Sequence, residues 1–434
     1  MYRHLQEVLF LQAAWAVAIF LLTYAFIVSE KIHRTVAAML GALIVVAAGL
    51  VEQHKAVEHI DFNTLGLLIG MMIIVHVTAE TGIFAYAAIK AAKLAKGEPV
   101  RILVALALVT ALGSAFLDNV TTILLIVPVT FSITRRLKVS PIPFLITQVI
   151  ASNAGGTATL IGDPPNIMIG SAVKELTFLA FIENLAPIIA IIMAVYVPIF
   201  MLIFRKQLRT TPELKARLME MEEDGLLHDR KLLIKSLSVL GLTIAGFFLH
   251  QALHLESATV ALAGAFILLL LTGERMLEAS LAAVEWPTLF FFIGLFVLVG
   301  GLVDTGVIGR LAENAVDLTG GDMKSASMLI LWLSAIASAF LDNIPFVATM
   351  IPLIQDMGSM GIDNLEPLWW SLALGACLGG NGTLIGASAN LVAAGISARE
   401  GYPIRFLTFL KYGFPLMLLS VALSSVYVYL RYLL

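Results

Sequence analysis

Cysteine is the scarcest reactive residue in this sequence. Cys377 is the only cysteine among 434 residues, which excludes an internal disulfide, a cysteine-ligated zinc cluster and a protein-bound iron–sulfur centre. No Gly-Lys-Ser or Gly-Lys-Thr triplet occurs, so the phosphate-binding loop of an ATPase is missing. No histidine is close in sequence to the polar motifs of the two hairpins, which argues against serine–histidine hydrolysis. We expect a protein that is not an enzyme and has neither a cofactor nor a nucleic-acid partner.

Charge is also scarce. Charged side chains make up 13% of the chain, whereas a typical soluble domain carries about 25%. Hydrophobic residues make up 59%, and the mean hydropathy is +0.95. Apolar runs of roughly 20 residues can cross a bilayer, and such runs recur at 8–28, 35–51, 179–204, 237–253 and 406–430. The sequence therefore predicts an all-α, multi-pass protein of the cell membrane, in contact with lipid.

An internal repeat divides the chain. The string SAFLDN at 114–119 recurs 224 residues later at 338–343, and TLIG at 159–162 recurs at 383–386. A constant shift without gaps indicates two copies of one unit. We assign the first copy to 1–204, a linker to 205–235 and the second copy to 236–434.

The linker fixes the predicted orientation in the membrane. It carries eight Lys or Arg residues, and by the positive-inside rule it is cytoplasmic, which places both termini outside. Basic clusters also flank the segment at about 101–135, which is too long for one span and too short for two. A re-entrant hairpin fits this length. The corresponding segment at about 324–356 enters from the opposite face, so each copy contains five spans and one hairpin, and the odd number inverts the second copy.

A broken span follows each hairpin. In the first copy, at about 143–174, Gly155 and Gly156 loosen the helix and Pro164 and Pro165 remove backbone donors. In the second copy, at about 367–398, glycines and small residues do the same without proline. The broken ends offer helix N-termini to anions and free carbonyls to cations.

The hairpin tips and the broken spans define the predicted site. Carboxylates are expensive at the bilayer centre, so acids there are functional candidates by default. We expect sodium, if it binds, at Asp118, Asn119, Asp342 and Asn343, and we note that Asp163 has no acidic counterpart in the second copy. The predicted substrate- or ion-binding residues are Asp118, Asn119, Thr121, Thr122, Asn153, Thr157, Thr159, Asp163, Asn166, Asp342, Asn343, Asn381, Thr383, Ser388 and Asn390.

These motifs look familiar. SAFLDNVTTILLIVPVT, GGTATLIGDPPNIMI, SAFLDNIPFVATMIPLI and LGGNGTLIGASANLVAAGI resemble the melanosomal P protein family of the ion transporter superfamily, which also contains arsenite permeases, sodium/proton antiporters, divalent anion/sodium symporters and citrate-transporter-like domains. The resemblance implies ten spans plus two hairpins, a scaffold and a moving transport domain that work as an elevator, and a homodimer. The Asp-Asn tips depart from the Ser-Asn-Thr of the dicarboxylate symporters.

Three functions are compatible with these features. The first is a secondary active transporter coupled to sodium, protons or both, most simply an antiporter, because the predicted site has buried acids and no arginine to hold a carboxylate. The second is proton- or sodium-coupled transport of a small anion or oxyacid, either arsenite and antimonite efflux or di- and tricarboxylate transport. An anion channel is the third. The cargo is a small ion or small molecule in each case.

Overall fold

The computed structural model describes residues 2–29, 31–221, 224–250, 252–362 and 364–434. The regular structure in these ranges is helical, which confirms the predicted all-α class. Nine of the described helices are long and apolar enough to cross a membrane. They are α1 (Tyr2–Ser29), α4 (Phe62–Ala79), α6 (Pro99–Phe116), α7 (Asn119–Leu137), α10 (Phe178–Phe204), α12 (Arg230–Leu249), α15 (Trp286–Asp304), α17 (Met323–Phe340) and α21 (Phe406–Tyr432).

The chain turns sharply at both Asp-Asn pairs. α6 ends at Phe116 and α7 begins at Asn119, with Asp118 as the cap of α7. In the second copy α17 ends at Phe340, and α18 (Asn343–Ser359) begins after the capping Asp342. An aspartate cap accepts hydrogen bonds from free N–H groups of the first helical turn. The two caps therefore lie where the antiparallel helices of each pair meet.

The segments predicted as broken spans are each two helices. α8 (Ile142–Thr157) and α9 (Pro164–Ala172) are separated by residues 158–163, and α19 (Glu366–Gly379) and α20 (Ser388–Arg399) by 380–387. Pro164 stands in the first turn of α9, where a missing N–H is tolerated.

Two glycines allow very close helix packing. A Cβ atom added to Gly155 would lie 2.1 Å from the carbonyl oxygen of Ala111, and one added to Gly379 would lie 2.6 Å from that of Ala335. Both glycines are 224 residues apart, as are both alanines. α8 therefore lies against α6, and α19 against α17, with backbone nearly touching backbone.

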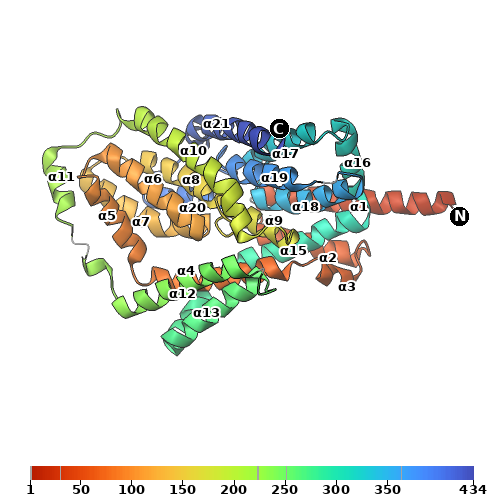
Figure 1. The fold of residues 1–434 in the computed structure, drawn as a ribbon, viewed down its shortest axis with the longest axis horizontal. Coiled ribbons are helices and arrows are strands. Elements are labelled where there is room, and N and C mark those ends of the chain that lie inside the picture. The colour runs from red at the N-terminus through yellow and green to blue at the C-terminus, as the bar shows by residue number, and fades with distance from the viewer. Residues whose placement is uncertain (1, 30, 222–223, 251, 363) are drawn as a thin grey trace.

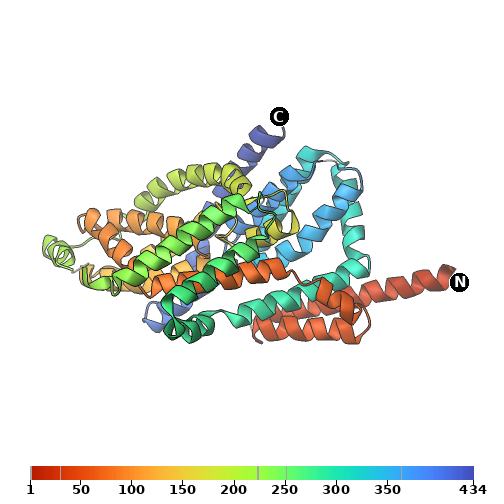
Figure 2. The ribbon, with the colours of Figure 1, turned by 60° about the horizontal axis from the view of Figure 1, so that its bottom comes forward.

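Two bodies account for most of the packing. The first, which we call the hairpin body, consists of α6–α9 and α17–α20; α9 packs on α18 and α20 packs on α7, so the two copies interlock. The second, the support layer, consists of α2 (Arg34–Ala47), α4, α13 (Ser257–Thr272) and α15, with α2 along α15 and α13 along α4. The support layer runs along the lower side of Figure 1 and is seen from another direction in Figure 2.

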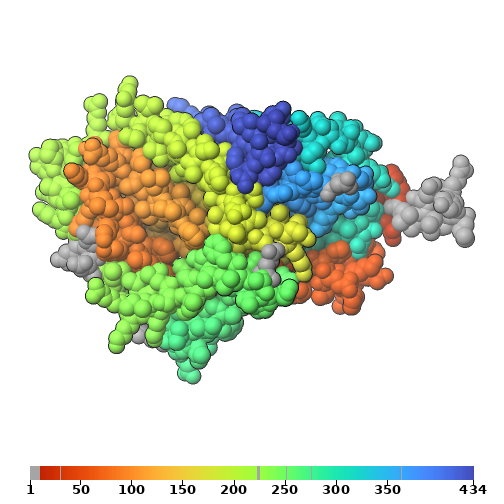
Figure 3. Space-filling view, in the orientation of Figure 1, coloured from red at the N-terminus to blue at the C-terminus, as the bar shows by residue number. Residues whose placement is uncertain are grey.

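The remaining helices surround these bodies. α10 and α21 pack on the hairpin body, and the Tyr196 hydroxyl donates to the Leu416 carbonyl at 2.8 Å. Figure 3 shows the blue, later part of the second copy meeting the yellow part of the first copy. The shorter helices are α3 (Gln53–Glu58), α5 (Ile83–Leu94), α11 (Pro212–Met219), a 3-10 turn (Asp224–Leu226), α14 (Glu274–Ala283) and α16 (Val307–Thr319).

The predicted linker is partly helical. It contains α11, and α12 already begins at Arg230; residues 222 and 223 of the linker lie outside the described ranges. The inverted orientation of the copies in the membrane, and the cytoplasmic position of the linker, stay predictions.

Candidate ion site between the hairpin tips

A small cavity lies where the hairpin body meets the support layer. Its volume is about 30 Å³, room for roughly one or two water-sized bodies. The hairpin body contributes Asp118, Asn119, Val120, Asp163, Pro164, Asn343, Ile344 and Ser388, and the support layer with its flanking turn contributes Arg34, Leu68, Met72, Glu285 and Thr288. The two tips predicted from the sequence therefore meet at one place, and acids outnumber bases in its wall.

Asp163 is the most deeply buried acid of this cavity. It is only 1% exposed. Its Oδ1 accepts a hydrogen bond from Asn119 Nδ2 at 3.3 Å, whereas its Oδ2 has no partner among the described residues. The Nδ2 atom of Asn343 is likewise buried without a described partner, and rotation of that amide would present its oxygen instead. Buried polar atoms normally have partners, and both of these residues line the same cavity, so this cavity is a candidate place for a ligand.

The asparagines join the two copies behind the cavity. Asn119 donates to Asn153 Oδ1 at 3.3 Å. Asn153 in turn donates to Asn381 Oδ1 at 2.9 Å and to Asn390 Oδ1 at 3.0 Å. This chain of amides runs from the first tip to the break of the second copy, so it fixes the relative position of both.

Several predicted residues hold the breaks and do not line the cavity. Asn166 and Asn390 each donate at 2.8 Å to the carbonyl of Thr159 and of Thr383, respectively. The Thr159 hydroxyl donates to the Ala115 carbonyl at 2.5 Å, and the Thr383 hydroxyl donates to that of Ala339. The Thr157 hydroxyl, another predicted group, donates to the Asn153 carbonyl at 2.7 Å. These side chains satisfy the backbone that the broken helices leave free.

The two threonines after the first tip differ in role. Asp118 Oδ1 accepts from the Thr121 N–H at 2.9 Å, and Oδ2 accepts from the Thr121 hydroxyl. Thr122 is buried, and its hydroxyl has no partner among the described residues. Thr121 therefore completes the cap of α7. Neither Thr121 nor Thr122 is among the residues that line the cavity.

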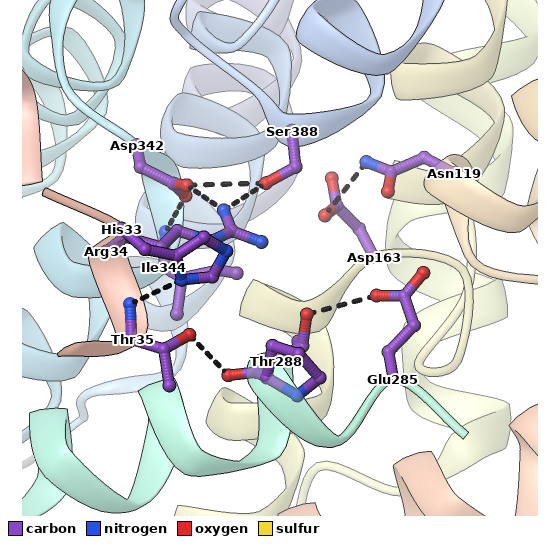
Figure 4. A network of polar contacts seen from close by, with 11 residues as sticks. His33, Arg34, Thr35, Asn119, Asp163, Glu285, Thr288, Asp342, Ile344 and Ser388 are labelled. Carbon is purple, nitrogen blue, oxygen red and sulfur yellow. Dashed lines mark hydrogen bonds and ion pairs between the residues drawn. The ribbon is translucent and has the colours of Figure 1, made fainter. Parts of the chain in front are cut away.

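The prediction that the site has no arginine is wrong. Arg34, the first residue of α2, donates from Nη1 to Asp342 Oδ2 at 2.9 Å and to Ser388 Oγ at 2.6 Å. Figure 4 shows its guanidinium group between these two side chains, facing Asp163 across the site. Sequence reasoning missed it because Arg34 lies 308 residues from Asp342, next to Lys31 and His33, where it looks like an ordinary basic residue at a membrane surface.

Glu285 is the second residue that the sequence reasoning missed. It precedes α15 and accepts from the Thr288 hydroxyl at 3.0 Å (Figure 4). The 224-residue shift places Asp61 and Thr64 at the equivalent start of α4, where the Thr64 hydroxyl donates to Asp61 at 2.5 Å. The acid and the threonine three residues later occur at equivalent positions in both copies, so the repeat could have pointed to Glu285 and to Asp61.

Asp61 lines a different cavity. This space has a volume of about 430 Å³ and lies between α9, α15 and α18, with His59 and Ser171 also in its wall. The Ser171 hydroxyl donates to Asp61 at 2.8 Å. The support layer thus has two equivalent acidic starts, one beside the small cavity and one beside a larger space.

The sequence matches the profile of the family described as "Citrate transporter" over residues 24–375. An uncharacterized transporter of Mycobacterium tuberculosis is 44% identical over 423 residues, covering 96% of this chain and 98% of that protein. The P protein of Mus musculus is 37% identical over 504 residues, covering 97% of this chain and 60% of the mouse protein. The resemblance to the P protein family is therefore confirmed.

One solved structure supports the fold. The YdaH transporter of Alcanivorax borkumensis, described as having an unusual topology, superimposes with a TM-score of 0.56 over 96% of this chain and 97% of that one. The sequence identity is 14%, so the likeness concerns the fold alone.

Proposed function

This chain belongs to the citrate transporter family and is a membrane transporter, and we propose that it exchanges small monovalent cations, sodium against protons, at the cavity between the hairpin tips. The observation that carries this proposal is the unpartnered Oδ2 of buried Asp163. An isolated buried carboxylate oxygen is unfavourable, and either a bound cation or a proton removes the penalty.

Charge supports a cationic cargo. Asp118, Asp163 and Glu285 line the cavity, and Asp342 pairs with Arg34, whose guanidinium is the single positive charge among the described residues of the wall. Arg34 neutralises one acid, so the remaining carboxylates favour a cation. Sodium and protons bind the same oxygens and exclude one another there, which is the basis of antiport.

Size supports the same conclusion. Pockets for ordinary small-molecule ligands have volumes of about 300–1,000 Å³, and this cavity has about 30 Å³. A dehydrated sodium ion fits such a space, whereas a tricarboxylate does not.

We propose alternating access by an elevator movement of the hairpin body along the support layer. The tips lie beside Glu285 and Thr288, and Asp61, the equivalent of Glu285, lines the 430 Å³ space at another part of the support layer. The repeat gives the support layer two equivalent acidic helix starts. The hairpin body could dock as a rigid unit at either one, which would give the two end states of alternating access. The homodimer expected from the resemblance belongs to the same proposal.

A small organic anion or an oxyacid is the second candidate cargo. Arg34 and Ser388 favour it, because a guanidinium beside a hydroxyl is a usual way to hold a carboxylate. A cavity of about 310 Å³ next to them would accommodate such a molecule. In this conformation, however, the Arg34 guanidinium already donates to Asp342 at 2.9 Å. An anion would therefore have to replace the Asp342 carboxylate as the partner of Arg34.

The test uses the full chain in proteoliposomes with an imposed sodium gradient and a proton-sensitive dye inside. We expect proton movement that depends on sodium and that Asp163→Asn abolishes. Asp322→Asn is the matched control, because Asp322 caps the exposed start of α17 and lies away from the cavity. If the gradient moves no protons while citrate or arsenite uptake is measurable, the second candidate replaces the first. Flux that survives crosslinking of the hairpin body to the support layer would instead indicate a channel.

A further inference from the structure

One ion pair separates two cavities. The 310 Å³ cavity is lined by His33, Arg34, Asp342 and Ser388 together with apolar residues of α1, α17 and α20. The 30 Å³ cavity also has Arg34 and Ser388 in its wall. The larger cavity opens at the surface, because its rim residues Val28 and Ile32 are exposed. The Arg34–Asp342–Ser388 contact therefore lies between this cavity and the one that contains Asp163.

The pair joins the two bodies. Arg34 belongs to the support layer, where its guanidinium also lies 5.1 Å from the ring centroid of Phe291 on α15. Asp342 and Ser388 belong to the hairpin body, and Ser388 Oγ lies 3.3 Å from Asp342 Oδ2. A movement of the hairpin body along the support layer must break both contacts of Arg34.

The pair exists at one end of the support layer only. The 224-residue shift places Ala258, at the start of α13, in the position of Arg34. Alanine has no charge, so the position that matches Arg34 in the repeat has no guanidinium. The cavity at that end has Lys174 in its wall, which pairs at 3.0 Å with Glu256, a residue outside the hairpin tips.

We propose that Arg34 is a tethered counter-cation that occupies Asp342 while no cargo is bound, and that a cargo cation or proton must displace it before the hairpin body moves. The inference rests on the proposed cation exchange and extends it. A carboxylate that has taken up a proton or a sodium ion no longer attracts the guanidinium, so loading releases the body. The empty carrier stays held, and exchange is favoured over one-way leakage.

The first test measures whether Arg34 and sodium compete for Asp342. Sodium binding is followed by the thermal stabilisation that sodium gives to the purified full chain. Arg34→Gln retains hydrogen-bonding capacity toward Asp342 and Ser388 but removes the charge. We expect it to bind sodium about tenfold more tightly, because the fraction of protein with a free Asp342 rises. Arg34→Lys, which keeps the charge, should stay near the wild type. His33→Asn is the control, since His33 lines the same cavity and caps α2 without contacting Asp342.

Leakage gives the second test. Proteoliposomes loaded with sodium and diluted into sodium-free buffer report how much sodium is lost for each proton taken up. This ratio should stay constant with the wild-type protein, whose hairpin body returns only when loaded, and should rise severalfold with Arg34→Gln, whose empty hairpin body can return. Exchange against external sodium should remain. Unchanged or weaker sodium binding together with unchanged leakage would overturn the role of Arg34.

A thiol measurement separates this inference from the proposed function. Leu68 is buried in the wall of the 30 Å³ cavity, and Cys377→Ser removes the native thiol. In that background Leu68→Cys should be protected from a cationic methanethiosulfonate reagent, and adding Arg34→Ala should expose it. Equal protection in both proteins would show that Arg34 is no barrier. If the wild type neither binds nor moves a cation, the proposed function fails, whatever the thiol result.

Discussion

The two hairpin tips share the sequence SAFLDN and differ in the residues immediately after it. The third residue after Asp118 is Thr121, whose N–H and hydroxyl donate to both carboxylate oxygens. The third residue after Asp342 is Pro345, which has neither group to donate. Asp342 therefore caps α18 only through Oδ1, at 3.2 Å from the Ile344 nitrogen. Its Oδ2 therefore accepts from Arg34 and lies 3.3 Å from Ser388 Oγ, so the first aspartate is a complete cap and the second is half of an ion pair.

A second difference lies in the breaks. Asp163 and Pro164 of the first copy correspond to Ala387 and Ser388 of the second. The first copy therefore contributes the deeply buried acid, and the second contributes the hydroxyl that holds the Arg34–Asp342 pair. Duplication preserved the helical frame, and the site became asymmetric within it.

The largest expected effect concerns the acids of the first copy. Asp163→Asn should lower sodium-dependent flux at least about 100-fold, or about 2.7 kcal/mol, because an amide cannot replace the unpartnered carboxylate oxygen. Asp118→Asn should lower it by less than about tenfold, since Thr121 already satisfies both oxygens of Asp118. Flux in proteoliposomes measures both, and equal losses would contradict the assignment of Asp163 as the main ligand.

The shared frame predicts equal losses of stability in the two copies. Gly155→Ala and Gly379→Ala each force a methyl group against a carbonyl oxygen, at 2.1 and 2.6 Å, and each should lower the free energy of unfolding by about 1–3 kcal/mol. Thermal unfolding in detergent reports the change. Gly241→Ala is the control, because nothing lies within 4 Å of its added Cβ. A loss in one copy only would break the structural equivalence.

The cap of the first tip predicts a smaller effect. Thr121→Val keeps the N–H and removes the hydroxyl, so the free energy of unfolding should fall by about 1 kcal/mol. Thr349→Val on α18, which loses only a hydroxyl bond to the Phe346 carbonyl, is the comparison. A melting temperature that falls no further for Thr121→Val than for Thr349→Val would remove the special role of this cap.

The smallest expected effect comes from making the second tip like the first. Pro345→Thr should supply the missing hydroxyl and N–H to Asp342 and weaken its pairing with Arg34. We expect uncoupled sodium loss to rise about threefold, because the pair that holds the empty hairpin body is weaker, whereas sodium affinity should change little because the new donors occupy the Asp342 oxygens themselves. Pro345→Val, which has the N–H but no hydroxyl, should lie between this variant and the wild type. Uncoupled loss equal to that of the wild type would mean that the Arg34–Asp342 pair does not hold the empty hairpin body.

The frame of the protein could be predicted from its sequence because it depends on local chemistry. Long apolar runs form helices, and Asp118, Asp342 and Pro164 stand where helices begin. Gly155 and Gly156 do not break α8, as the sequence predicted, because the helix continues through both to Thr157. The repeat added a further constraint, since two identical strings 224 residues apart must form similar structures. The all-α class and the family followed from these features.

The contact between Arg34 and Asp342 could not be predicted in this way, and Glu285 has a signal only in its repeat equivalent Asp61. Both flank apolar helices, as many charged residues of membrane proteins do, and nothing local distinguishes them. Sequence determined that acids gather at two tips and one break. Only the tertiary structure decided which of them meet, because the packing of α2 along α15 brings Arg34 to Asp342 across 308 residues of chain.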